Sequence, residues 1–199
     1  MMAVATLLLG LMIGFAGGFA FNTLVERPTP AAPVDTAGET LPELALTVAE
    51  LFKSGDFVSL SGYVHPIYGV VFSPKMTVSL KSCRCLSPAD LASLDRDTAL
   101  RVWGTAEGSA VPLELTARDY LMLYVNDRDY TAARLIGVDY PARVGNALDN
   151  TADVFPSGHY VELCCTGEDA ASWTTLRLVF EEYEGNWYLT AVIHAAYII

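Results

Sequence analysis

Basic residues are scarce in this chain. It contains 12 Lys and Arg against 23 Asp and Glu, so the formal net charge over its 199 residues is −11. A protein that binds DNA or RNA needs clustered basic side chains to neutralise phosphates, and no basic run occurs in the sequence. An anionic membrane surface would repel a domain of this charge for the same reason. The composition therefore predicts that nucleic acid is not a partner.

The sequence also lacks the short motifs that mark common active sites. It has no glycine-rich phosphate loop, no serine nucleophile elbow and no metalloprotease helix. Its four cysteines are Cys83, Cys85, Cys164 and Cys165, whereas zinc sites are usually built on C-x-x-C-like spacing. Neither a metal nor a cofactor is predicted.

The even number of cysteines indicates disulfides if the chain folds outside the cytoplasm. Cys83 and Cys85 would point to one face of an extended segment, whereas Cys164 and Cys165 would point to opposite faces of a strand. Two parallel bridges between the pairs would therefore strain the sheet. Two disulfide patterns remain: one cross-link with two free thiols, or two cross-links.

The N-terminal segment is strongly apolar. Ala3 to Phe21 carries no charge and no proline, and its length suits a bilayer core of ~30 Å. We expect residues 1–22 to form a transmembrane signal anchor, which would hold a single-pass protein in the cell membrane with its folded domain outside the cytoplasm. The alternative is a signal peptide cleaved after Ala20, which would release a secreted protein.

A proline-rich stretch follows the apolar segment. Residues 27–40 read RPTPAAPVDTAGET, with three prolines among small side chains. This composition is typical of a stiff, extended linker. We expect residues 23–40 to form a spacer outside the core and residues 41–199 to fold as one domain.

Helix signals dominate the first half of that domain. A capping box at Thr40 predicts a helix that ends at Gly55, and Asp56 can cap a second helix. This second helix should reach position 64 and stop before the proline at position 66. Further helices are expected after Ser87 and Thr116. Strands are expected over 68–80 and 100–103.

The C-terminal part alternates between apolar and polar residues and predicts three long strands. They span 159–165, 174–183 and 187–198, and a tight turn at 184–186 joins the last two. Helices followed by an antiparallel meander indicate an α+β fold.

The alternation also predicts which side chains of the last two strands share a face. In the first of these strands Leu176, Leu178 and Phe180 should point one way, opposite Arg177, Val179 and Glu181. In the second, Trp187, Leu189, Ala191 and Ile193 should share a face, opposite Tyr188, Thr190, Val192 and His194.

Several of these segments resemble a known superfamily. LFKSGDFVSLSGYVHP and EEYEGNWYLTAVIH are similar to the NTF2-like (cystatin-like) superfamily. YVHPIYGVVFSP, WGTAEGSAVPLELT and LRLVFEEYEGNWYLTAVIH resemble uncharacterised bacterial extracytoplasmic proteins, which are secreted or attached to a membrane. The resemblance covers residues 43–199 and implies a cone, in which N-terminal helices pack on a curved antiparallel sheet around a pocket. The superfamily includes isomerases, dehydratases and non-catalytic binding modules, so fold alone does not choose among these roles.

The resemblance implies that candidate site residues lie in the cone. Enzymes of the superfamily use an Asp or His base with a hydrogen-bond donor for the developing oxyanion. The pocket candidates are His194, Tyr188, Arg177, Glu181, His65, Tyr68 and Trp103. Further candidates are Asp127 and Asp129 as bases and Tyr63, Tyr120 and Tyr124 as donors.

Each histidine and tryptophan candidate also has a structural interpretation. His65 could cap a helix end, and His194 could pair with a carboxylate such as Glu181. Trp103 could lie in the core, and His159 is expected at the surface.

The sequence favours a non-catalytic role. We expect a membrane-tethered extracytoplasmic module that binds an unknown small molecule or an envelope protein. The alternative is a small-molecule isomerase or lyase that uses a pocket histidine or carboxylate. A third hypothesis is a structural envelope protein that forms a homodimer through an open sheet face.

Overall fold

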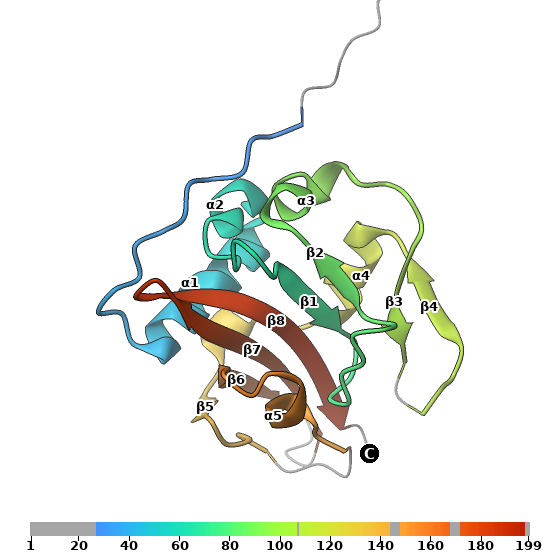
Figure 1. Ribbon diagram of the computed structural model, residues 1–199. Coiled ribbons are helices and arrows are strands. Elements are labelled where there is room, and N and C mark those ends of the chain that lie inside the picture. The colour runs from blue at the N-terminus through green and yellow to red at the C-terminus, as the bar shows by residue number, and fades with distance from the viewer. Residues whose placement is uncertain (1–26, 107, 144–147, 168–171, 198–199) are drawn as a thin grey trace, which may run out of the picture.

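A curved, mixed sheet wraps around helix α1 (Leu41–Ser54) in the computed structural model (Figure 1). The structure describes residues 27–106, 108–143, 148–167 and 172–197. The strand order of the six-stranded sheet is β2-β1-β8-β7-β6-β5. These strands are β1 (Val70–Ser73), β2 (Arg84–Leu86), β5 (Leu135–Val138), β6 (His159–Thr166), β7 (Trp173–Tyr183) and β8 (Asn186–Tyr197). Strands β3 (Arg101–Thr105) and β4 (Pro112–Leu115) form a separate antiparallel pair.

The α+β class is confirmed, but the expectation of a wholly antiparallel sheet is wrong. β1 lies parallel to β8, with Phe72 opposite Val192, and the other neighbours in the sheet are antiparallel. Alternation in a sequence shows that a strand exists but not which distant strand lies beside it. Two strands from opposite ends of a domain are not joined by a hairpin, so no turn sets their relative direction.

Helix α1 forms where its end signals predict. Glu43 Oε2 accepts hydrogen bonds from the Thr40 backbone N–H and hydroxyl, and Gly55 ends the helix in the left-handed conformation at φ 71°. The buried face carries Leu44, Val48 and Phe52 at helical spacing. This face packs against the concave side of the sheet.

The second helix is shorter than predicted. α2 (Phe57–Ser61) is capped by Asp56 as expected, but Val64 lies in a parallel bridge with Leu189 of β8. Only β1 forms within the β-rich segment 68–80. Val64 pairs with β8 instead of continuing α2, and β1 also pairs with β8, so contacts with the long hairpin β7–β8 decide where α2 ends and where β1 forms.

The remaining helices are short. α3 (Pro88–Ala92) and α4 (Ala117–Tyr124) follow the predicted caps, although Leu123, which the spacing places on the buried face of α4, is exposed. The other elements are α5 (Thr151–Val154), η1 (Leu94–Arg96) and η2 (Tyr130–Ala132).

A β-bulge changes the faces of β8. Phe180 pairs with Leu189 and Val179 pairs with Ala191, so Thr190 has no partner of its own. An extra residue in one strand reverses the alternation beyond it. Leu189 and Val192 therefore belong to one hydrophobic cluster, whereas Ala191 and Ile193 belong to another. The prediction that Leu189, Ala191 and Ile193 share a face is wrong for this reason.

Both faces of the sheet carry a core. The helix face packs on the helices and includes Leu176, Leu178 and Phe180 of β7. The second face includes Val179, Ala191 and Ile193 and packs against Phe155 and the segment that carries Met76 and Val78. In Figure 1 this second face is turned toward the viewer, with α5 in front of the strands.

The proline-rich stretch lies along the domain rather than standing free as the predicted spacer. The Val34 N–H donates to the Gly62 carbonyl, and the Ala31 N–H donates to the Ser61 hydroxyl. Thr36 is fully buried, and its hydroxyl donates to the Trp187 carbonyl and accepts from the Trp187 N–H. Proline composition predicts an extended backbone, but it does not exclude hydrogen bonds from the residues between the prolines.

The predicted transmembrane segment lies outside the described residues. Among the residues that the structure describes, no helix is both long enough and apolar enough to cross a bilayer.

Replacing Thr36 by Val should destabilise the domain by about 1–3 kcal/mol, because the Trp187 N–H loses its acceptor on the fully buried Thr36 side chain. Urea unfolding at constant m value measures this change. Thr29→Val is the matched control, since Thr29 is exposed on the same segment. Equal stability of the two variants would show that the segment does not contribute to the fold.

Candidate functional site

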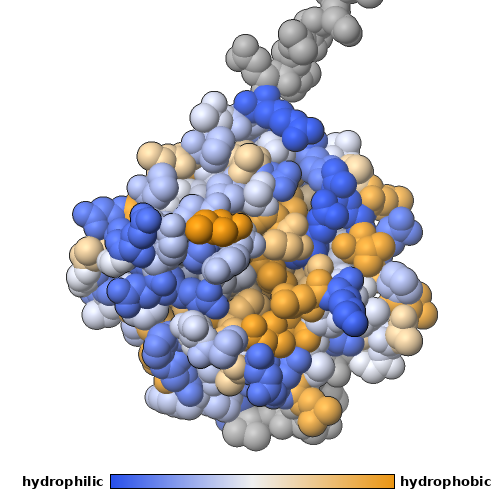
Figure 2. All heavy atoms as spheres, in the orientation of Figure 1, coloured by the Kyte–Doolittle hydropathy of each residue, from blue (hydrophilic) through white to orange (hydrophobic). Residues whose placement is uncertain are grey.

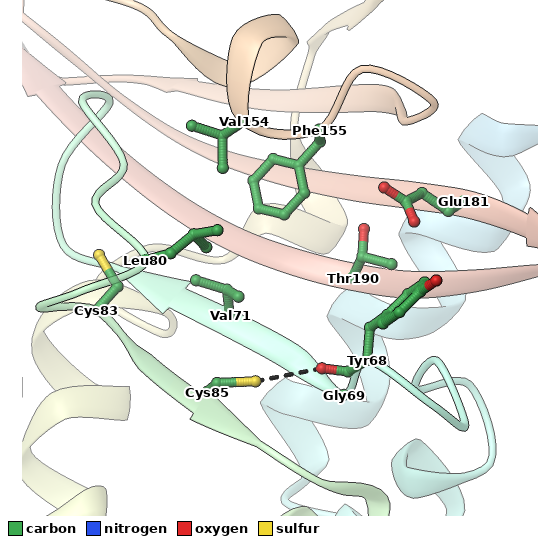
Figure 3. A pocket seen from close by; sticks show the side chains of 10 residues that line it. All are labelled: Tyr68, Gly69, Val71, Leu80, Cys83, Cys85, Val154, Phe155, Glu181 and Thr190. Carbon is green, nitrogen blue, oxygen red and sulfur yellow. Dashed lines mark hydrogen bonds between the residues drawn. The ribbon is translucent and has the colours of Figure 1, made fainter.

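A cavity of about 400 Å³ opens on the second face of the sheet. Figure 2 shows apolar atoms gathered on this side of the molecule, where the surface is hollowed. We call this cavity the apolar pocket, and Figure 3 shows the side chains that line it. They are Tyr68, Gly69, Val71, Leu80, Cys83, Cys85, Val154, Phe155, Glu181 and Thr190.

Three separate parts of the chain supply the apolar walls. Val71 projects from β1, Leu80 from the segment between β1 and β2, and Val154 and Phe155 from the end of α5 (Figure 3). Leu80 is 61% exposed, so it stands at the mouth, whereas Val71 and Phe155 are buried. The pocket therefore forms only when α5 and the 74–83 segment close over the sheet.

The polar groups come mainly from the central hairpin. Glu181 of β7 and Thr190, the bulged residue of β8, lie at one end of the pocket beside Tyr68 (Figure 3). The Thr190 hydroxyl donates to the Val179 carbonyl, so its oxygen remains an acceptor. Burial raises the pKa of Glu181 above its ordinary value, because a charged carboxylate is less well solvated beside apolar walls.

Two thiols line the edge of the pocket that β2 forms. Cys85 Sγ donates to the Tyr68 carbonyl at 3.3 Å. Burial, and secondarily the negative charge of Asp90, raises the pKa of the Cys85 thiol, which disfavours the reactive thiolate. The Cys85 thiol therefore behaves as a small apolar lining group.

Gly69 allows β1 to come close to β2 at this edge. A Cβ at position 69 would lie 2.4 Å from the Leu86 carbonyl oxygen, and the backbone there has φ +71°. Only glycine adopts this conformation without strain. The close approach brings the Tyr68 carbonyl within reach of Cys85.

The structure brings two of the predicted candidates, Tyr68 and Glu181, into the same pocket. The proposed pair of His194 and Glu181 does not form, because the bulge at Thr190 turns His194 toward the helix face. His194 Nε2 instead lies 3.4 Å from Asp127 Oδ2, and Tyr124 packs edge-on against the imidazole.

Asp127 and Asp129 contact different partners. Asp127 also accepts from the Tyr130 hydroxyl at 2.8 Å, while Asp129 pairs with Lys53 at 2.9 Å. Burial alone would raise the pKa of Asp127, but the hydrogen bonds and charge around it outweigh burial and lower that pKa. Within the described ranges, no group of three or more His, Cys, Asp or Glu side chains could hold a metal ion.

Arg177 lies on the second face but away from the apolar pocket, fully buried in an ion network. Its Nε and Nη2 donate to Glu162 Oε2 at 2.9 and 2.7 Å, and its Nη1 donates to Asp149 Oδ2 at 2.6 Å. The guanidinium also stacks 4.0 Å from the centre of the Tyr160 ring. Paired in this way, Arg177 has its charge compensated inside the sheet and is not available to a ligand.

The other candidates have structural contacts. Trp103 is fully buried, stacks on Tyr120 at 4.2 Å and donates from Nε1 to the Leu115 carbonyl. His65 is buried, and its Nδ1 accepts from the backbone N–H groups of Ile67 and Tyr68.

His65 and Tyr188 lie side by side behind the pocket. Their ring centres are 5.9 Å apart, and His65 stacks on Tyr68. Burial lowers the pKa of His65, which favours the neutral imidazole that accepts these bonds. His65 therefore orients Tyr68 rather than capping α2, which ends at Ser61.

The cysteine count suggested disulfides, but all four cysteines are free thiols. In the sheet order, β6 is four strand positions from β2, or roughly 19 Å at the usual strand spacing. A disulfide joins Cα atoms that are at most about 7 Å apart. Cross-links between the two cysteine pairs are therefore excluded, which neither the count nor the spacing could show.

Most of the apolar wall was not predicted from the sequence. Val71, Leu80, Val154 and Phe155 read as ordinary core residues, and Thr190 reads as one polar position in an alternating strand. Alternation from the turn places Thr190 on the same side as Glu181, but nothing in the sequence indicated that this position lines a pocket.

Searches with protein-family models, curated proteins and solved structures find no match for this chain. The geometry of the pocket is therefore the basis for any functional conclusion.

Glu181→Gln should stabilise the folded chain more at neutral pH than under acidic conditions. Because the folded state raises the pKa of Glu181, its contribution is fully present below the ordinary value of 4.5 and is lost as the pH rises through the raised pKa. Glutamine resembles the protonated form at every pH, so it avoids this loss. Free energies of unfolding, measured well below pH 4.5 and near neutrality, compare the two proteins.

The exposed Glu182→Gln variant controls for the removal of one negative charge. If both variants respond identically to pH, Glu181 is not desolvated by the pocket.

Proposed function

We propose that this chain is a membrane-tethered, extracytoplasmic binding module whose apolar pocket takes a small, largely apolar molecule with one hydrogen-bonding group. The observation that carries this proposal is the pocket itself: apolar walls converge on a single polar end formed by Glu181, Thr190 and Tyr68. Small-molecule sites typically combine apolar lining with a few placed polar groups in volumes of roughly 300–1,000 Å³.

The arrangement of the pocket favours binding over catalysis. An isomerase or lyase would need a base and an oxyanion donor that meet the same atom. Glu181 has the raised pKa that suits such a base, and this feature favours the enzyme alternative. However, the Thr190 hydroxyl already donates to Val179, and His65 and His194 lie elsewhere. The remaining donor, Tyr68, is 66% exposed to water. Binding requires no such pair.

The tether is inferred from the sequence and from the docked segment that follows it. We infer that Ala3 to Phe21 enters the membrane, as its length and lack of charge suggest. Since residues 31–36 bind to the domain, only a short stretch would separate the domain from the bilayer. An NTF2-like relationship remains part of the proposal, and the curved sheet around α1 is compatible with it.

Leu80→Asp should weaken the binding of the neutral apolar probe N-phenylnaphthylamine by at least roughly tenfold, equivalent to about 1.4 kcal/mol. The variant places a charge at the mouth of the pocket. Leu100→Asp is a matched control, because Leu100 is 64% exposed against 61% for Leu80 and does not line the pocket. Fluorescence titration of the full chain measures both affinities.

Equal binding by the two variants would mean that the probe does not occupy this pocket. If Leu80→Asp does weaken binding of the probe, mass spectrometry of small molecules that co-purify with the wild type, but not with Leu80→Asp, would identify the natural ligand.

The full chain should be found in the membrane fraction of bacterial cells, and protease added to spheroplasts should digest its domain. A chain that begins at Arg27 should remain in the cytoplasm and be protected. Protection of the full chain inside intact spheroplasts would contradict the proposed orientation. A soluble extracytoplasmic product that begins at Phe21 would show a cleaved signal peptide in place of the anchor.

A further inference from the structure

Four arginines from four different segments meet in a groove on the other side of β2 from the apolar pocket. Its volume is about 300 Å³. Arg27 comes from the docked N-terminal segment, Arg84 from β2, Arg96 from η1 and Arg101 from the start of β3. We call this feature the arginine groove.

The arginine groove is rich in positive charge, although the chain as a whole is acidic. The whole chain has 12 Lys and Arg and a net charge of −11. Among the residues that the structure describes, however, four arginines and two carboxylates, Asp90 and Asp97, line this groove. A local excess of positive charge inside an acidic molecule concentrates anions at one place on its surface.

The two carboxylates are already engaged. Asp97 Oδ2 accepts from Arg101 Nε at 2.5 Å. Asp90 Oδ2 accepts from the Ser87 hydroxyl at 2.7 Å and completes the capping box of α3. Both side chains therefore fix the walls of the groove.

Arg84 carries an unmet hydrogen-bonding group at this site. Its Nε is buried and has no hydrogen-bond partner among the described residues. A buried N–H without an acceptor is costly, and such groups in folded proteins usually have a partner. Strand pairing with Phe72 holds the Arg84 backbone in place, so a movement of the side chain is needed to bring this N–H to an acceptor in the groove.

The Arg84 side chain points to the opposite side of the strand from the side chains of Cys83 and Cys85. Cys83 and Cys85 line the apolar pocket, while Arg84 and Leu86 line the arginine groove. Alternation along a strand sends successive side chains to opposite faces. The two sites are therefore separate, and a ligand in one does not contact the other directly.

We propose that the arginine groove binds a phosphate group through the guanidinium groups that line it. The planar guanidinium fork matches the paired oxygens of a phosphate and can donate two hydrogen bonds to it. Several forks that approach from different elements suit a tetrahedral anion better than a planar carboxylate. This binding site is distinct from the apolar pocket and does not depend on the function proposed for it.

The phosphate could belong to a soluble anion or to a lipid headgroup. Arg27 follows closely after the apolar segment that ends at Phe21. If this segment lies in the membrane, the groove stands near the level of the headgroups, although the overall charge of the domain opposes contact with an anionic surface. Both sources present the same chemical group, and the experiment separates them.

The test uses the full chain in phosphatidylcholine nanodiscs. Titration with inorganic phosphate, against sodium chloride at matched ionic strength, should raise the unfolding temperature of the wild type. Arg84→Gln should weaken the apparent affinity for phosphate by at least roughly tenfold, because it removes a charged donor. Arg134→Gln removes an exposed arginine elsewhere and should leave the affinity unchanged.

A second arm replaces part of the phosphatidylcholine by phosphatidylglycerol. If only this lipid stabilises the chain, and Arg84→Gln abolishes the effect while Arg134→Gln does not, the phosphate is that of a lipid headgroup. Should Arg84→Gln fail to fold, Arg96→Gln at an exposed position of the groove repeats both arms.

The proposal is overturned if neither inorganic phosphate nor phosphatidylglycerol stabilises the wild type beyond the chloride control. It is also overturned if the groove variant and Arg134→Gln respond identically.

Discussion

The burial of both faces of β7 is the constraint on which the rest of this structure depends. Every residue from Trp173 to Phe180 is buried, so the sheet must be covered twice. The helices cover one face, and α5 with the 74–83 segment covers the other. Arg177 falls in the middle of this doubly covered strand, and its charge is tolerated because Glu162 and Asp149 accept from it.

The apolar pocket lies where the second cover is incomplete. Toward the turn of the hairpin, α5 and the 74–83 segment leave part of the sheet open, and the bulge at Thr190 lies there. Alternation from Tyr188 places Thr190 on the second side with Glu181, and the bulge adds Ala191 to that side. The same bulge turns His194 to the helix face, where it meets Asp127. One extra residue in β8 therefore decides which polar side chains a ligand could reach.

The short strand β2 serves both sites. Its alternation presents the thiols of Cys83 and Cys85 to the apolar pocket and the guanidinium of Arg84 to the arginine groove. Gly69 brings β1 close enough for the Tyr68 carbonyl to accept from Cys85. The docked N-terminal segment then brings Arg27 to the groove, so that a stretch expected to be a free spacer contributes to a site.

Local sequence determined the features that depend on neighbouring residues. The capping box at Thr40, the left-handed Gly55, the caps at Asp56, Ser87 and Thr116, and the long C-terminal strands all formed as their residues predict. These signals depend on hydrogen bonds and conformational preferences within one or two turns of the chain. The α+β class followed from their order.

Tertiary structure decided what depends on residues far apart. The parallel pairing of β1 with β8, the bulge at Thr190 and the docking of Thr36 on Trp187 each join segments whose proximity no periodicity encodes. The site residues belong to this second group: Tyr68 and Glu181 were recognisable as polar candidates, but their apolar partners and the four arginines of the groove were not. A pocket forms where several elements converge, and convergence is a property of packing rather than of any one stretch of sequence.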